Sequence, residues 1–154
     1  MSVEVESVWD YPRPPRVEPS SELVIVRHRG HTLVESTSTL RVLETSHPPT
    51  YYLPFADVDW SFFEQVEGST WCEFKGAATY ADIVVQGQRI PRVAWWYETP
   101  TPGFAVLKDF LALYPDRVDE ATVDGEVVQA QEGDFYGGWI TSKVTGPFKG
   151  APGT

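Results

Sequence analysis

A short stretch in the first third of the chain carries side chains suited to acid–base chemistry and to ligand binding. Residues 39–53 contain Arg41, Glu44, His47, Tyr51 and Tyr52. Glutamate and histidine can act as general acid and base when one of them titrates near the working pH. Arginine can hold a carboxylate or phosphate, and tyrosine rings can stack on a planar ligand. We therefore predict that Glu44 and His47 are catalytic and that Arg41, Tyr51 and Tyr52 bind a ligand.

The backbone of this stretch is expected to change from a strand to a stiff turn. The β-branched residues within 39–46 favour an extended chain, and Pro48 and Pro49 then end it, each compatible with a cis peptide bond. Such rigidity suits a preorganised site and equally suits a structural corner. Two alternatives stay open: Glu44 can simply reach solvent at the strand end, and His47 can be a hydrogen-bonded structural group.

The charge of the chain argues against several classes of partner. The 154 residues include 12 lysines and arginines and 22 aspartates and glutamates, which gives a net charge of −10. Phosphate backbones and acidic membrane surfaces repel such a chain, so we expect no nucleic-acid and no membrane partner. The sequence shows neither a signal-peptide pattern nor an apolar run of membrane-spanning length, and we expect a cytoplasmic protein.

Cysteine and histidine are too few for a recognisable metal site. Cys72 is the only cysteine, and His28 and His31 flank a predicted turn. Disulfide frameworks and thiolate zinc clusters both require several cysteines. We therefore expect no metal and no cofactor. Cys72 itself fits a buried small side chain better than a nucleophile.

Alternation of apolar residues and frequent turn signals predict a mainly β, antiparallel domain. Outside the hairpins, strands are expected at residues 39–46 and 70–74, and a short helical turn is expected within residues 54–67. Residues 104–114 fit either a helix or a strand that starts at Phe110. The predicted hairpins join residues 23–27 to 32–35 around Gly30, 79–85 to 90–97, and 121–124 to 126–129 at the type I′ signal Asp124-Gly125.

The length of the chain suits one domain. Residues 1–21 are rich in proline and arginine, and we predict an extended arm without regular structure that packs on the domain, with a disordered leader as the alternative. Residues 22–150 are expected to form the domain, and residues 151–154 a flexible tail.

Several motifs together resemble the DUF427 family. The matching segments are residues 41–52, 72–76 with 79–80, 94–97 with Pro100, 114–118, and 137–150. The resemblance implies a β-tent-like fold, in which two antiparallel sheets meet at an angle and leave a cleft, with few short helical turns. The family is also filed under a nucleotidyltransferase-type heading, but this sequence has neither a P-loop nor spaced aspartate ligands for Mg²⁺. The cysteine-pair zinc clamp of related folds is likewise absent from the sequence.

The resemblance further implies that these motifs line the cleft. It adds to the predicted ligand-binding residues Lys75, Tyr80, Trp95, Trp139 and Lys149. We expect the cleft to bind a small polar or anionic molecule. One alternative is a small enzyme, a transferase or hydrolase, that uses Glu44 and His47. A second is a protein-interaction module with an exposed apolar patch at Trp9, Tyr11 and Phe55.

Overall fold

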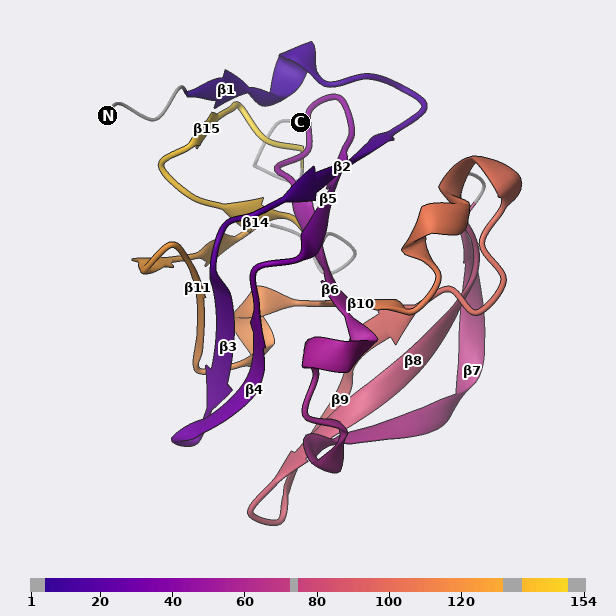
Figure 1. Ribbon diagram of the computed structural model, residues 1–154, viewed down its shortest axis with the longest axis vertical. Coiled ribbons are helices and arrows are strands. Elements are labelled where there is room, and N and C mark those ends of the chain that lie inside the picture. Colours follow the sequence, from indigo (N-terminus) through magenta and orange to yellow (C-terminus); the bar gives the residue numbers. More distant parts are fainter. Residues whose placement is uncertain (1–4, 73–74, 132–136, 150–154) are drawn as a thin grey trace.

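The computed structural model of the chain describes residues 5–72, 75–131 and 137–149, and most of its regular structure is β-strand (Figure 1). This confirms the predicted mainly β, antiparallel fold; the tail predicted at 151–154 lies outside the described residues. The largest sheet has seven antiparallel strands. In order across the sheet they are β2 (Arg16–Ser20), β5 (Thr39–Leu43), β6 (Thr50–Pro54), β10 (Phe110–Leu113), β9 (Gln88–Trp96), β8 (Gly76–Val85) and β7 (Phe63–Cys72).

A second antiparallel sheet has four strands. In order they are β12 (Glu126–Val127), β11 (Glu120–Val123), β3 (Val24–His28) and β4 (His31–Ser36). The turn predicted at Gly30 is confirmed by its φ of 79°, and the type I′ turn by φ of 49° at Asp124 and 82° at Gly125. In Figure 1, β3 and β4 diverge from β7, β8 and β9, so that the two sheets meet at an angle as expected.

Apolar side chains from both sheets fill the space between them. Val24 and Val26 of the four-stranded sheet belong to one core cluster with Leu53, Ile83 and Leu111 of the seven-stranded sheet, and all five are 0% exposed. Their burial removes apolar surface from water, which is the main force that holds the two sheets together.

The other face of the seven-stranded sheet carries an aromatic cluster. Successive residues of a strand point to opposite faces, so Tyr52 and Trp95 lie here while Tyr51 and Trp96 face the core between the sheets. Phe104, from the helix that follows β9, packs onto this aromatic face.

Short 3₁₀ helices connect the strands. They are η1 (Val8–Asp10), η2 (Phe55–Asp57), η3 (Trp60–Phe62), η4 (Pro102–Leu107) and η5 (Pro115–Arg117). The helical turn predicted within 54–67 is confirmed by η2 and η3, and residues 104–114 divide into the end of η4 and then β10. Strand β7 begins at Phe63, before the predicted start at residue 70, and residues 73–74 of the predicted strand lie outside the described part. Because β7 is an exposed edge strand, its sequence lacks the apolar alternation that marks a half-buried one.

The prediction of an arm without regular structure is wrong for residues 16–20, because they form the strand β2. The strand pairs with β5 from Arg16 opposite Leu43 to Ser20 opposite Thr39. Its proline content argued against a strand, yet Pro19 is compatible with β2 because this strand lies at the edge of the sheet, where one row of N–H groups needs no partner. The peptide bonds before Pro48 and Pro49 are trans, whereas cis bonds precede Pro14 and Pro147 in the described part of the chain.

The two ends of the described chain hold each other, in an arrangement that we call the terminal clasp (residues 5–11 and 143–148). Trp9 Nε1 donates to the Pro147 carbonyl at 2.8 Å, and Val8 and Tyr11 are buried beside Val144. The clasp thereby orders much of the predicted arm. Within the clasp, β1 (Glu6–Ser7) pairs in parallel with β15 (Val144–Thr145). A second short pair is antiparallel and joins β13 (Gln129–Ala130) to β14 (Trp139–Ile140). Neither pair was predicted.

Candidate functional site

The residues predicted to line one cleft lie in several places in the structure. Arg41 and Tyr51 form one group; Glu44, His47 and Lys149 a second; Tyr52, Lys75, Tyr80 and Trp95 a third; and Trp139 is in the core between the sheets.

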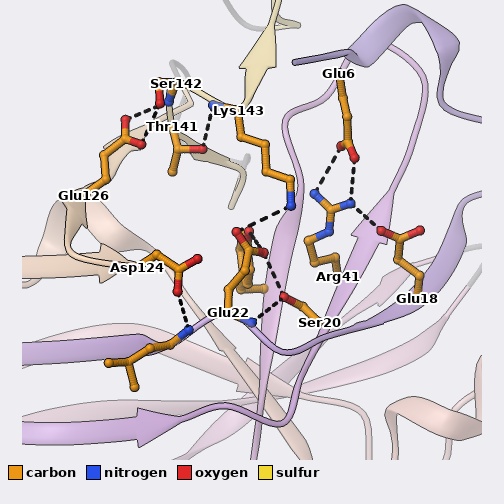
Figure 2. A network of polar contacts seen from close by, with 12 residues as sticks. Glu6, Glu18, Ser20, Glu22, Arg41, Asp124, Glu126, Thr141, Ser142 and Lys143 are labelled. Carbon is orange, nitrogen blue, oxygen red and sulfur yellow. Dashed lines mark hydrogen bonds and ion pairs between the residues drawn. The ribbon is translucent and has the colours of Figure 1, made fainter. Parts of the chain in front are cut away.

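Arg41 belongs to a buried ionic network beside β2 (Figure 2). Its side chain is 3% exposed, and its guanidinium donates two hydrogen bonds of 3.2 Å to the Glu6 carboxylate and also pairs with Glu18. Burial alone would raise the pKa of Glu6, but the hydrogen bonds from Arg41 and Tyr11 bring it below its usual value. Two carboxylates thus already neutralise Arg41, which leaves it poorly suited to hold an anionic ligand.

The network continues into a small pocket between the β11–β12 hairpin and residues 141–143 (Figure 2). Tyr51, 2% exposed, donates its hydroxyl to Glu22 at 2.8 Å, and Lys143 Nζ lies 3.5 Å from the same carboxylate. The pocket has a volume of about 280 Å³ and is lined by Glu22, Val123, Asp124, Glu126, Thr141, Ser142 and Lys143. Its carboxylates outnumber its lysine, so this pocket disfavours an anion.

Glu44 and His47 stay close together in the turn after β5. The His47 backbone N–H donates to the Glu44 carbonyl at 3.0 Å, and the Glu44 carboxylate pairs with Arg13 at 3.2 Å. His47 Nδ1 lies 2.9 Å from Nε2 of Gln131, whose Nε2 also donates to the Lys149 carbonyl at 2.7 Å. Burial lowers the pKa of His47, although the charge of Glu44 counteracts it. The imidazole is therefore neutral near pH 7.

The third group lies on the aromatic face of the seven-stranded sheet. Tyr52 is 1% and Trp95 8% exposed, and burial raises the pKa of the Tyr52 hydroxyl above its usual value. Lys75 Nζ lies 5.9 Å from the centre of the Phe104 ring, and the Tyr80 hydroxyl lies 2.7 Å from the hydroxyl of a threonine on β7. This face gathers more of the predicted ligand-binding residues than either other group.

Tyr80 also belongs to a second set of side chains at this face, which we call the Arg–Tyr cluster: Tyr80, Arg92, Tyr114 and Arg117. The Arg92 guanidinium stands 4.4 Å from the centre of the Tyr80 ring, and that of Arg117 stands 4.3 Å from the centre of the Tyr114 ring. Arg117 also donates to the Arg92 carbonyl at 3.3 Å, and the Tyr114 ring is 4.7 Å from Trp95. Cation–π stacking of this kind fixes the position of flexible arginine side chains.

The two arginines of the cluster were missed by sequence reasoning. Neither is among the predicted ligand-binding residues, and Arg92 lies in a predicted strand where nothing distinguishes it by type. The available signal was Pro91, because a proline inside a strand marks an edge or a bulge. The register between β8 and β9 indeed shifts after Ala81, and Arg92 has a φ of 48°.

Asp82 holds this bulge in place. Its side chain is 8% exposed and accepts the Arg92 backbone N–H at 2.8 Å, and it pairs with Arg89 at 2.7 Å. Burial would raise the pKa of Asp82, but the hydrogen bonds from Arg92 and Arg89 lower it. Asp82 therefore engages the backbone of Arg92 and leaves its guanidinium on the face of Tyr80.

The charges of the Arg–Tyr cluster are not neutralised by carboxylates. Throughout residues 5–72, 75–131 and 137–149, neither Arg92 nor Arg117 forms an ion pair, whereas Arg41 and Arg89 each bind two carboxylates. The Arg92 side chain is exposed and that of Arg117 half-buried. At this cluster a chain of net charge −10 thus presents two arginines, beside tyrosine rings, that form no ion pair with a described carboxylate.

Two consecutive glycines lie between Trp95, which contacts the cluster, and the residues around His47. A Cβ on Gly137 would lie 2.4 Å from Cη2 of Trp95, and one on Gly138 would lie 2.5 Å from both Pro48 Cγ and Gln131 Oε1. Because glycine has no Cβ, the backbone at Gly137 can approach the indole of Trp95 closely.

Trp139, predicted as a ligand-binding residue, is 0% exposed and belongs to the core between the sheets. Its Nε1 donates to the Leu113 carbonyl at 3.4 Å, and its ring centre is 5.1 Å from that of Tyr51. Trp139 and Tyr51 therefore stabilise the joint between the sheets. Cys72 is half-buried beside the aromatic cluster.

Two further properties concern only the described part of the chain. Within it, no group of three or more histidine, cysteine, aspartate or glutamate side chains is arranged to hold a metal ion. Within the same residues, no helix has the length and apolar character needed to cross a membrane.

Comparison with known proteins supports the resemblance seen in the sequence. The sequence model of a protein family, the domain of unknown function DUF427, matches residues 16–124. This range contains the seven-stranded sheet from β2 onward, most of the four-stranded sheet and all of the Arg–Tyr cluster. No curated protein matches the chain.

Proposed function

Since the chain belongs to DUF427, a family whose function is unknown, we propose from the site itself that the domain binds a small anionic molecule at the Arg–Tyr cluster. The observation that supports this proposal is the pair of stacked guanidiniums of Arg92 and Arg117, which no described carboxylate neutralises. Guanidinium groups form strong, directional hydrogen bonds with anionic oxygens.

The cluster is organised before a ligand arrives. Stacking on Tyr80 and Tyr114 restricts both arginines, and the hydrogen bond between Arg117 and the Arg92 carbonyl fixes them relative to each other. A ligand therefore meets side chains that lose little conformational freedom on binding. Each charge-assisted hydrogen bond contributes on the order of 1.5–3 kcal/mol. Tyr52, Lys75 and Trp95 remain in the proposal as residues of the surrounding aromatic face.

The experiment is thermal unfolding in the presence of inorganic phosphate, sulfate and acetate. A ligand at about a hundred times its Kd adds roughly 2.7 kcal/mol to the free energy of unfolding. For a domain of this size that raises Tm by about 5–10 °C. The response should be lost in Arg92→Met and in Arg117→Met. It should persist in Arg27→Met, which removes an equal charge from an exposed position on β3. An equal response in all three variants would refute the proposed site.

A second candidate function, acid–base catalysis by Glu44 and His47 in a transferase or hydrolase, has one observation in its favour. Burial lowers the pKa of His47, so its imidazole is neutral near pH 7, which is the protonation state that a general base requires. Because Gly137 and Gly138 connect this group to Trp95, a ligand on the cluster would lie on the same side of the molecule. Turnover that disappears in His47→Gln while ligand binding remains would support this candidate.

A protein-interaction module has less support. The patch expected for it combined Trp9, Tyr11 and Phe55. Trp9 is 52% exposed, but Tyr11 is only 7% exposed inside the terminal clasp, and Phe55 packs against the main core. The three side chains do not form one exposed apolar patch.

A further inference from the structure

We infer that the Arg–Tyr cluster selects a doubly charged phosphate monoester of a small molecule over singly charged anions. This inference rests on the proposed function and narrows it to one class of ligand. It follows from two guanidinium charges that form no ion pair with a described carboxylate, and from the hydrogen-bond donors that these two groups carry.

The cluster brings two positive charges to one place. Arg117 donates to the Arg92 carbonyl at 3.3 Å, which brings the two arginines together; the Asp116 carboxylate acts on the Tyr114 hydroxyl beside them but forms no ion pair with either arginine. The nearest buried carboxylate, Asp82, is occupied by the Arg92 backbone and by Arg89. A singly charged anion would leave one of the two guanidinium charges uncompensated, whereas a dianion balances both.

The donors also match a tetrahedral acceptor. The central carbon of each guanidinium lies over a tyrosine ring, and no described carboxylate forms an ion pair with either group, so N–H donors remain for a ligand. Of the donors of Arg117, Nη1 is occupied by the Arg92 carbonyl. A carboxylate has two oxygens in one plane and satisfies a single guanidinium fork. A phosphate monoester has three terminal oxygens and can accept from two guanidiniums at once.

The pH dependence of binding separates the ligand classes. Arginine stays protonated across the accessible range, so the charge of the two arginines does not change. The second pKa of a phosphate monoester is about 6, so its dianion falls to about a tenth of the total at pH 5. Affinity for a phosphate monoester should therefore rise about tenfold from pH 5 to 7.5. A sulfate monoester, charged once at both pH values, should show no such rise.

The experiment is isothermal titration of the full chain with phenyl phosphate, phenyl sulfate and benzoate at constant ionic strength, at pH 5 and 7.5. These probes share one ring and differ in charge and in the number of acceptor oxygens. We expect phenyl phosphate to bind at least tenfold more tightly than the other two at pH 7.5, with a smaller difference at pH 5. The preference should be lost in Arg92→Met and Arg117→Met and kept in Arg27→Met.

Each outcome has one meaning. Equal, pH-independent affinity for the three probes, lost in the arginine variants, would overturn the dianion inference while anion binding at the cluster stands. Binding that does not respond to either arginine variant, or no binding at all, would overturn both. Arg92→Lys and Arg117→Lys, which keep the charge but lose the fork, serve as folded comparisons, and their circular dichroism spectra should match that of the unaltered chain.

Discussion

Replacing Arg41 by methionine tests whether the buried ionic network stabilises the fold. The substitution removes the buried counter-charge that Glu6 and Glu18 share, and leaves the exposed Arg16 as the ion-pair partner of Glu18. Removal of one partner from a fully buried ion pair costs about 3–5 kcal/mol. The Glu6 and Glu18 side chains are 32% and 35% exposed, so water can hydrate them in part. We therefore expect a loss at the lower end, about 3 kcal/mol, and a fall in Tm of about 6–12 °C.

The measurement is urea unfolding at pH 7 and at pH 3, with Arg16→Met as the control. Arg16 pairs with the same Glu18 at 3.6 Å but is 59% exposed, so its removal should cost less than about 1 kcal/mol. Because the pKa of Glu6 is lowered in the folded chain, its contribution is present above the unfolded value of 4.5 and is lost as the pH falls through the folded value. The effect of Arg41→Met should thus shrink at pH 3. A loss below about 1 kcal/mol at pH 7, or a pH-independent loss, would refute the reasoning.

Three other substitutions test separate parts of the structure. Gly137→Ala places a Cβ 2.4 Å from Trp95, so it should lower the free energy of unfolding by about 1–3 kcal/mol and change the tryptophan fluorescence. The control is Gly103→Ala, whose Cβ would meet nothing within 4 Å, and it should change the free energy of unfolding by less than about 0.5 kcal/mol. Asp82→Ala removes the acceptor of the Arg92 backbone N–H, so it should destabilise the bulge by about 1–3 kcal/mol in urea unfolding and weaken anion binding; unchanged binding would show that Asp82 does not position Arg92. His47→Gln should flatten the fall in stability between pH 7 and 5, because the lowered pKa of His47 lets the unfolded chain bind a proton first, below about 6.5. An unchanged pH profile would contradict the burial of the imidazole.

Local structure could be predicted from the sequence where single residues dictate the backbone. Gly30 and the Asp124-Gly125 pair require positive φ, and the hairpins around them formed as expected. Strand β7 was largely missed because an exposed edge strand has no buried face, and therefore no apolar period to detect. Strand β2 was missed because its proline suggested an irregular chain, although an edge strand accommodates one.

The site was predictable only where family motifs and the sheet coincide. Tyr52, Tyr80 and Trp95 were expected together, and the shared face of neighbouring strands places them together. The partners of Arg41 could not be foreseen, since Glu6 and Glu18 lie 35 and 23 residues away in the sequence. The sequence shows that a residue is an arginine, but it does not show whether carboxylates form ion pairs with it in the fold. Arg41 pairs with two carboxylates, whereas the two arginines of the cluster pair with none among the described residues.

The terminal clasp has a consequence for how this chain folds and how it can be re-engineered. Trp9 and Pro147 are separated by 138 positions, so their contact closes a loop that spans nearly the whole chain. Closing so long a loop is slow relative to hairpin formation, and the clasp should assemble after the sheets. Because β1 and β15 lie side by side, a circularly permuted chain in which a linker joins these two strands should preserve the fold, with the new termini at the exposed Gln86-Gly87 turn.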